Sequence, residues 1–216
     1  MCIRDRAETI PIFPLELILF PSENLNLHIF EERYRQLIKD ANDQKFEFGI
    51  PYFMKGKEMV YGCTAILKSI TRTYEDGRMD IKTVGSKVFR IHQLHKHSED
   101  KLYSSATIDF IDNNNEYDIV ATTKLSELIA DLYKFMNITK PIPELETPMF
   151  SYLVGHHVGL SKEQELELLS INSEEARQGY LIEHLTELLP VVKEMESLRK
   201  KVEMNGHFKN LKPPLF

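Results

Sequence analysis

The sequence predicts an α+β protein, with a β-rich first half curled into a small barrel and a helical second half. Three prolines, Pro11, Pro14 and Pro21, interrupt an apolar, strand-like run over residues 10–30. Proline fixes its own φ and cannot donate a hydrogen bond to a sheet ladder. The run is therefore expected to form short extended pieces bent around a core. Later in the chain, apolar residues recur at helical spacing instead of alternating.

The first half contains strand patterns separated by turn signals. The predicted strands cover residues 10–13, 25–30, 46–53, 59–73, 78–92 and 102–111, and residues 31–41 are expected to form a helix. Asp76-Gly77 joins the two longest strands and is a strong hairpin signal. Gly85 lies inside the second of them, where it predicts a bulge or a sharp bend. Residues 112–115 end the β section.

The second half opens with an apolar stripe at helical spacing. The stripe consists of Ala121, Leu125, Leu128, Ile129, Leu132 and Met136. We expect Lys140-Pro-Ile-Pro143 to stop this helix and Thr147-Pro148 to open the next segment, which closes at Gly159. Ser161 and Gln164 have the spacing of a capping box at the start of a further helix.

The last predicted helix covers residues 173–202 and contains Pro190, which should kink it. Its apolar residues follow steps of four and three: Leu181, Leu185, Leu188, Val192, Met195, Leu198 and Val202. This stripe is either the seam of a homodimer or, as we favour, a face packed on the helix at 121–136 and on the barrel. The predicted division is a barrel, a helical bundle and an extended tail, over residues 1–115, 116–204 and 205–216.

The composition is that of a globular protein, 42% hydrophobic and 28% charged. Residues 1–115 carry 16 Lys+Arg against 17 Asp+Glu, a net charge of -1, and residues 116–216 carry 11 against 16, a net charge of -5. Nucleic-acid binders usually show a basic face, so this balance makes a nucleic-acid partner unlikely as the primary ligand.

The sequence has the features of a cytoplasmic protein. No apolar stretch approaches the roughly 20 residues that span a bilayer, so no membrane contact is expected. Residues 1–6 carry charges of both signs, unlike a signal peptide. Cys2 and Cys63 are the only cysteines, a count that fits a reducing compartment.

Two motifs in the first half are distinctive: Ile10-Pro-Ile-Phe-Pro-Leu15 and Leu27-His-Ile-Phe-Glu-Glu-Arg-Tyr34. Five shorter segments accompany these two motifs: Phe48-Gly49-Ile50, Gly62-Cys-Thr-Ala65, Asp76-Gly-Arg78, Val84-Gly85 and Phe89-Arg-Ile91. Together they resemble the N-terminal substrate-binding domain of the ATP-dependent Lon proteases, most specifically over residues 9–111. The resemblance implies a PUA-like pseudo-barrel that carries an α-helical bundle.

A complete Lon protease also has an ATPase module and a Ser-Lys peptidase module, and this sequence shows the motifs of neither. It has no Gly-x-x-x-x-Gly-Lys-Ser/Thr phosphate loop. The adjacent pairs Ser86-Lys87 and Ser161-Lys162 fall in a predicted strand and a predicted helix cap. No serine lies in a motif that offers a base and an orienting group. We therefore expect a free-standing binding domain with no catalytic residue and no cofactor.

His92, His95 and His97, with Asp100 and Cys63, have some likeness to a metal site. The alternative is a polar loop that follows a strand. Structural zinc sites offer clearer pairing of cysteine and histidine, so we predict no metal.

An aromatic and proline cluster is the candidate binding surface: Phe20, Pro21, Phe30, Tyr34, Tyr52 and Phe53. Because large aromatic residues supply much of a small domain's core, we expect only an exposed fraction of them to contact a ligand. The predicted function is recognition of unfolded, apolar polypeptide segments or of a protein partner, at a barrel edge or an apolar patch. The alternative is an RNA- or nucleotide-binding module, since PUA-like barrels can bind RNA.

Overall fold

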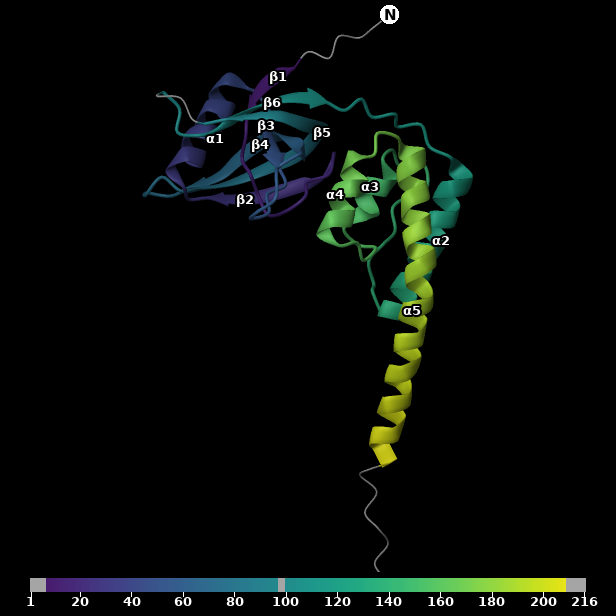
Figure 1. The fold of residues 1–216 in the computed structure, drawn as a ribbon. Helices are drawn as coiled ribbons and strands as arrows, with labels where there is room; N and C mark the ends of the chain where they lie inside the picture. Colours follow the sequence, from purple (N-terminus) through teal and green to yellow (C-terminus); the bar gives the residue numbers. More distant parts are fainter. Residues whose placement is uncertain (1–6, 97–99, 209–216) are drawn as a thin grey trace, which may run out of the picture.

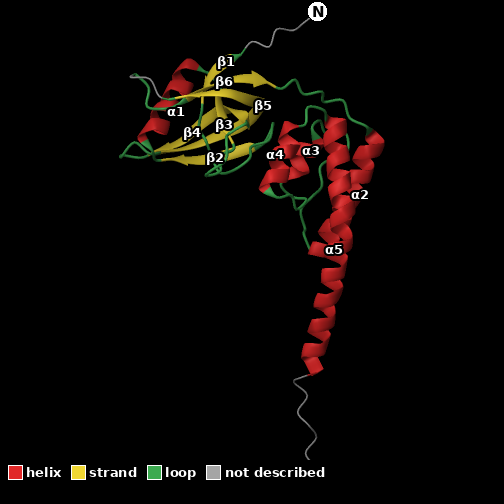
Figure 2. Cartoon of the chain, viewed as in Figure 1, coloured by secondary structure: helices red, strands yellow, loops and turns green. Residues whose placement is uncertain are grey.

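The chain folds into a curled antiparallel sheet followed by a group of helices (Figure 1) in a computed structural model that describes residues 7–96 and 100–208. The strands are β1 (Glu8–Pro11), β2 (Asn24–Ile29), β3 (Phe48–Pro51), β4 (Tyr61–Thr73), β5 (Met79–His95) and β6 (Ser105–Phe110). The helices are α1 (Glu32–Gln44), α2 (Ile119–Met136), α3 (Phe150–Gly155), α4 (Lys162–Ser170) and α5 (Glu174–Phe208). The predicted α+β class is confirmed, and Figure 2 shows the strands and helices separated into two parts apart from α1.

The long strand β5 organises the sheet. Strand β4 pairs along one edge of β5, and β2 and β6 follow one another along the other edge, all antiparallel. Strand β1 adds to β6, and β3 adds to β4. The segment after β1 then closes the pseudo-barrel, because Ile12 and Leu15 form parallel bridges with Gly49 and Tyr52. Pro11 ends β1 and Pro14 lies within the closing segment, as expected of residues that end or bend an extended chain.

The predicted hairpin between β4 and β5 is confirmed. Gly77 has a φ of 83°, and the Tyr74 N–H donates to the carbonyl of Arg78 at 2.9 Å. The Arg35 guanidinium of α1 donates to the carbonyl of Asp76 at 2.6 Å and so joins the helix to this turn. The inner face of α1 covers the barrel core with the buried residues Tyr34, Leu37, Ile38 and Ala41.

Gly85 marks the predicted bulge, and the structure gives its reason. The register of β4 and β5 shifts between Cys63 and Ala65, opposite Gly85. Here the segment before β2 crosses β5: the Ser22 N–H donates to the Gly85 carbonyl, and the Gly85 N–H donates to the Glu23 carbonyl, both at 2.9 Å. A β-carbon on Gly85 would lie 2.1 Å from the carbonyl oxygen of Phe20.

Two predicted helix boundaries were wrong. Helix α2 ends at Met136, before the prolines, because Asn137 takes a left-handed conformation and its N–H donates to the carbonyl of Tyr133. Helix α3 begins at Phe150, and no side chain caps it, so Thr147-Pro148 is not its N-terminus. The capping box of α4 is confirmed, since Ser161 and Gln164 exchange side chain–backbone hydrogen bonds.

Helix α5 is longer than predicted and extends past the other helices (Figure 1). It continues through Phe208, so residues 205–208 are helical and not an extended tail, while residues 209–216 lie outside the described part. Pro190 lies inside it, and the kink expected there stays a prediction. The apolar stripe packs only in its first half: Leu181 and Leu185 are buried, but Met195 is 65% exposed. Within the described ranges, no helix combines the length and the apolar composition needed to cross a membrane.

The barrel and the helices each have an apolar core. The barrel core gathers β-strand residues under α1, including Phe48, Ile50 and Ile81. The helical core joins α2, α3, α4 and α5 and also includes Ile18, Phe20, Tyr52 and Val88 from the first half of the chain. The two parts are therefore packed together through these four side chains, of which Phe20 is fully buried.

Candidate binding site

The structure separates the six predicted binding residues into two groups. Phe20, Pro21 and Tyr52 are buried. The Phe20 ring stacks on Tyr152 at a centroid distance of 5.1 Å and lies 4.5 Å from the ring of His156. Phe20 and Tyr52 both belong to the apolar core of the helical part. Burial leaves Phe20, Pro21 and Tyr52 with little surface for a ligand, so ligand contact at these three residues stays a prediction.

The other three predicted residues, Phe30, Tyr34 and Phe53, line one pocket of about 400 Å³, together with Phe13, Leu27 and Ile29. We call it the barrel pocket. It forms where the segment after β1, strand β2 and the start of α1 meet. Phe30 is 62% exposed and Phe53 is 37% exposed, so these two rings offer apolar surface to solvent at the pocket.

The bent segment after β1 supplies one wall of the barrel pocket. The Leu15 N–H donates to the carbonyl of Pro51 at 3.2 Å, and the Phe53 N–H donates to the carbonyl of Leu15 at 2.8 Å. Phe13 stacks on Tyr34 with a centroid distance of 3.9 Å, which joins this wall to α1. The pocket thus lies between backbone-bonded segments and does not depend on one loose loop.

Charges at the barrel pocket are paired within the protein. Arg33 Nη2 lies 2.6 Å from Glu31 Oε2, and the guanidinium lies 4.7 Å from the centroid of the Tyr34 ring. Burial raises the pKa of Tyr34, while Arg33 acts in the opposite direction, so this phenol is neutral at neutral pH. His28 Nδ1 lies 2.6 Å from Asp80 Oδ1. The arrangement suits an apolar ligand better than an ionic one.

Strand β2 brings a sheet edge to the same pocket. Among the described strands, it pairs with β5 alone, so its second edge lies outside the ladder. Leu27, His28 and Ile29 of this strand line the barrel pocket. An unpaired strand edge presents backbone donors and acceptors that can pair with another extended chain.

The proposed likeness to a metal site does not hold for the residues that can be placed. His92 Nε2 contacts Asp109 of β6, and His95 Nε2 lies 2.7 Å from a threonine hydroxyl of that strand. Cys63 is fully buried, and burial raises the pKa of its thiol well above the ordinary value. His97 lies outside the described residues. Within the described part of the chain, no three His, Cys, Asp or Glu side chains are grouped to hold a metal ion.

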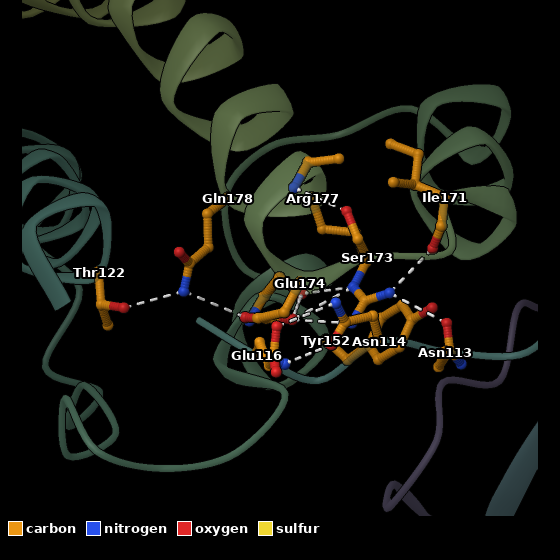
Figure 3. A network of polar contacts seen from close by, with 12 residues as sticks. Asn113, Asn114, Glu116, Thr122, Tyr152, Ile171, Ser173, Glu174, Arg177 and Gln178 are labelled. Carbon is orange, nitrogen blue, oxygen red and sulfur yellow. Dashed lines mark hydrogen bonds and ion pairs between the residues drawn. The ribbon is translucent and has the colours of Figure 1, made fainter. Parts of the chain in front are cut away.

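Sequence reasoning missed a buried polar network in the helical part (Figure 3). Glu174 and Arg177 form an ion pair at 2.9 Å with both side chains fully buried. The Ser151 hydroxyl donates to Glu174 at 2.6 Å and accepts from Arg177 Nε at 2.9 Å. The Gln178 amide donates to Thr122 at 2.8 Å and so connects α5 to α2. Ser151 is 0% exposed, so this network holds the helices together and offers no accessible nucleophile.

The structure thus joins a pseudo-barrel to a group of helices and places an apolar pocket at a strand edge. The chain belongs to the family of the ATP-dependent protease La (LON) substrate-binding domain, whose model matches residues 9–187. The match concerns this binding domain only.

Solved structures agree on the fold. The Lon N-terminal domain protein from Xanthomonas campestris is 20% identical, with a TM-score of 0.62 over 81% of this chain and 97% of that one. The N-terminal domain of the Mycobacterium avium complex Lon protease is 13% identical, with a TM-score of 0.63 over 83% of this chain and 98% of that one. At these identities the similarity concerns the fold alone.

Proposed function

We propose that this protein is a non-catalytic cytoplasmic module that binds apolar segments of unfolded polypeptide at the barrel pocket. The observation that carries the proposal is the apolar pocket of about 400 Å³ beside the unpaired edge of β2. Its volume falls within the range of about 300–1,000 Å³ that is usual for ligand pockets. Membership of the substrate-binding family supports a polypeptide as the ligand. The buried, unpaired thiol of Cys63 fits a reducing compartment.

In the proposed binding mode, an extended peptide lies along β2. The peptide backbone pairs with the free edge of the strand, and this pairing does not depend on the peptide's sequence. One apolar side chain of the peptide enters the pocket beside Phe30 and Phe53. A folded protein keeps its backbone groups and apolar side chains engaged internally. The mode therefore selects unfolded chains over folded ones.

The test is a titration with two forms of one labelled polypeptide. One form is kept unfolded by carboxymethylation of its cysteines, and the other is the native disulfide-bonded form. Fluorescence anisotropy should show saturable binding of the unfolded form and none of the folded form. Equal, negligible binding of both forms contradicts the proposal.

RNA binding is the second function to test, because PUA-like barrels can bind RNA. The pairing of Arg33 with Glu31 and the net charge of -6 disfavour it, since phosphate contacts supply most of the affinity for nucleic acid. A salt-dependent mobility shift with RNA is the result that would favour it.

A homodimer through α5 is a further part of the proposal. Met195, Leu198 and Val202 are 65%, 54% and 70% exposed in the half of α5 that extends past α2. A second copy could cover this apolar stripe. Sedimentation velocity should then show a dimer that Leu198→Glu converts to a monomer, and a wild-type monomer at high concentration contradicts it.

A further inference from the structure

A second apolar pocket lies in the helical part, between the end of α2, the turn after α3 and the middle of α5. Its volume is about 390 Å³, and its lining includes Leu132, Met136, Ile138 and Val192. We call it the helical pocket. Met136 is 54% exposed and Ile138 is 40% exposed, so apolar surface continues from the pocket to solvent.

The helical pocket also carries a lysine, Lys140, from the segment after α2. The Lys140 ammonium contacts His157 Nε2 and, among the residues that the structure describes, has no carboxylate within 4.0 Å. Burial lowers the pKa of His157, and the nearby Lys140 and His156 lower it further. His157 is therefore a neutral acceptor that holds the ammonium at the pocket.

The two carboxylates that act on His157, Glu23 and Glu165, are already engaged. His156, which also lines the helical pocket, has Nδ1 2.9 Å from Glu165 and Nε2 3.2 Å from Glu23. Glu165 pairs in addition with Lys162 at 2.6 Å. These contacts satisfy Glu23 and Glu165 within the protein and leave the charge of Lys140 available to an anionic ligand.

We propose that the helical pocket binds the free C-terminus of a polypeptide that ends in apolar residues. The terminal carboxylate pairs with Lys140, and the last side chains pack against Met136, Ile138 and Val192. A charge-assisted pair between an ammonium and a carboxylate is stronger than a neutral hydrogen bond. The exposed rim lets the rest of the chain leave the pocket, whereas a pocket for a small ligand usually encloses most of that ligand. The choice of a polypeptide rests on the proposed function.

The test uses a fluorescein-labelled Gly/Ser peptide that ends in Leu-Leu, prepared with a free C-terminal carboxylate and as the C-terminal amide. The full chain should bind the free acid roughly tenfold more tightly than the amide. Lys140→Gln should remove most of this preference. Lys134→Gln is the matched control, because Lys134 lies in the last turn of α2 and outside the lining of the helical pocket.

Equal affinity for the acid and the amide, or a preference that Lys140→Gln leaves intact, overturns the proposal. Dodecanoate that binds in a Lys140-dependent manner, with no binding of the acid peptide, assigns the helical pocket to fatty acids and also overturns it. Failure of the barrel pocket is distinguishable, since Phe30→Ser should weaken binding of an unfolded chain with a blocked C-terminus but leave the ratio between acid and amide unchanged.

Discussion

His156 Nε2 lies 3.2 Å from Glu23 Oε2, so a histidine that follows α3 contacts a carboxylate of the segment that precedes β2. The same carboxylate accepts from the Phe20 N–H at 3.0 Å. His156 Nδ1 lies 2.9 Å from Glu165 of α4. These contacts surround Phe20, so a polar connection and an apolar one join the barrel to the helices at the same place.

This connection should make stability depend on pH. Burial by itself lowers the pKa of His156, but the hydrogen bonds with Glu23 and Glu165 outweigh it and raise the pKa above the ordinary value of 6.5. A raised pKa in the folded state stabilises the fold fully below about pH 6.5, and this contribution is lost as pH rises through the raised pKa. The difference in unfolding free energy between wild type and His156→Gln should therefore shrink as pH increases, measured by urea unfolding.

His157→Gln is a control, because its effect on the unfolding free energy should depend on pH in the opposite direction. Burial, followed by Lys140 and His156, lowers the pKa of His157. Its neutral form is favoured by folding, so its contribution is present above about pH 6.5 and is lost as pH falls. If both variants shift the pH profile in the same direction, the assigned roles of the two histidines are wrong.

Gly85→Ala should destabilise the protein strongly. The new methyl group would lie 2.1 Å from the Phe20 carbonyl oxygen, which is backbone and cannot rotate away. We expect a loss of about 3 kcal/mol or more in the free energy of unfolding. Gly179→Ala is the control: apart from its own turn of helix, no described atom lies within 4 Å of the added methyl, and helix propensity predicts a gain of up to about 1 kcal/mol. Similar urea midpoints for the two variants would contradict the close approach at Gly85.

Arg177→Met should also destabilise the fold, because Glu174 would keep a buried charge without its cation. Loss of one partner from a buried ion pair costs about 3–5 kcal/mol. The double variant Glu174→Leu/Arg177→Met should cost less than the sum of the two single variants, as a double-mutant cycle can measure. The exposed pair of Arg78 with Asp76 is the comparison, and Arg78→Met should leave the unfolding midpoint nearly unchanged. If the losses in unfolding free energy of the two single variants simply add in the double variant, Glu174 and Arg177 do not stabilise the fold as a pair.

Local signals in the sequence predicted much of the fold. The Asp-Gly turn at Gly77, the bulge at Gly85 and the capping box at Ser161 each depend on a few neighbouring residues, and the structure contains all three. The end of α2 could not be predicted in this way, because the left-handed conformation of Asn137 ends the helix before the proline signal. Local chemistry favours such a conformation at asparagine without requiring it.

The candidate site was only partly predictable for a different reason. Phe20 and Phe30 are the same residue type in similar extended segments, and the pattern around them does not distinguish them. Phe20 is buried because Tyr152, from the helical part, stacks on it, whereas Phe30, between β2 and α1, has 62% of its surface exposed. Arg177 was missed because charged residues are usually on the surface, and its burial depends on Ser151 and Glu174.

The most direct measurement is the affinity for the carboxymethylated, unfolded polypeptide of Phe30→Ser and Leu94→Ser, compared with wild type. Phe30 and Leu94 are both large exposed apolar residues of the barrel part, at 62% and 47%, but only Phe30 lines the barrel pocket. Circular dichroism would show that both variants are folded. Phe30→Ser should raise the Kd about tenfold, as expected for loss of an aromatic anchor, and Leu94→Ser should leave it unchanged. An unchanged Kd for Phe30→Ser would contradict polypeptide binding at the barrel pocket.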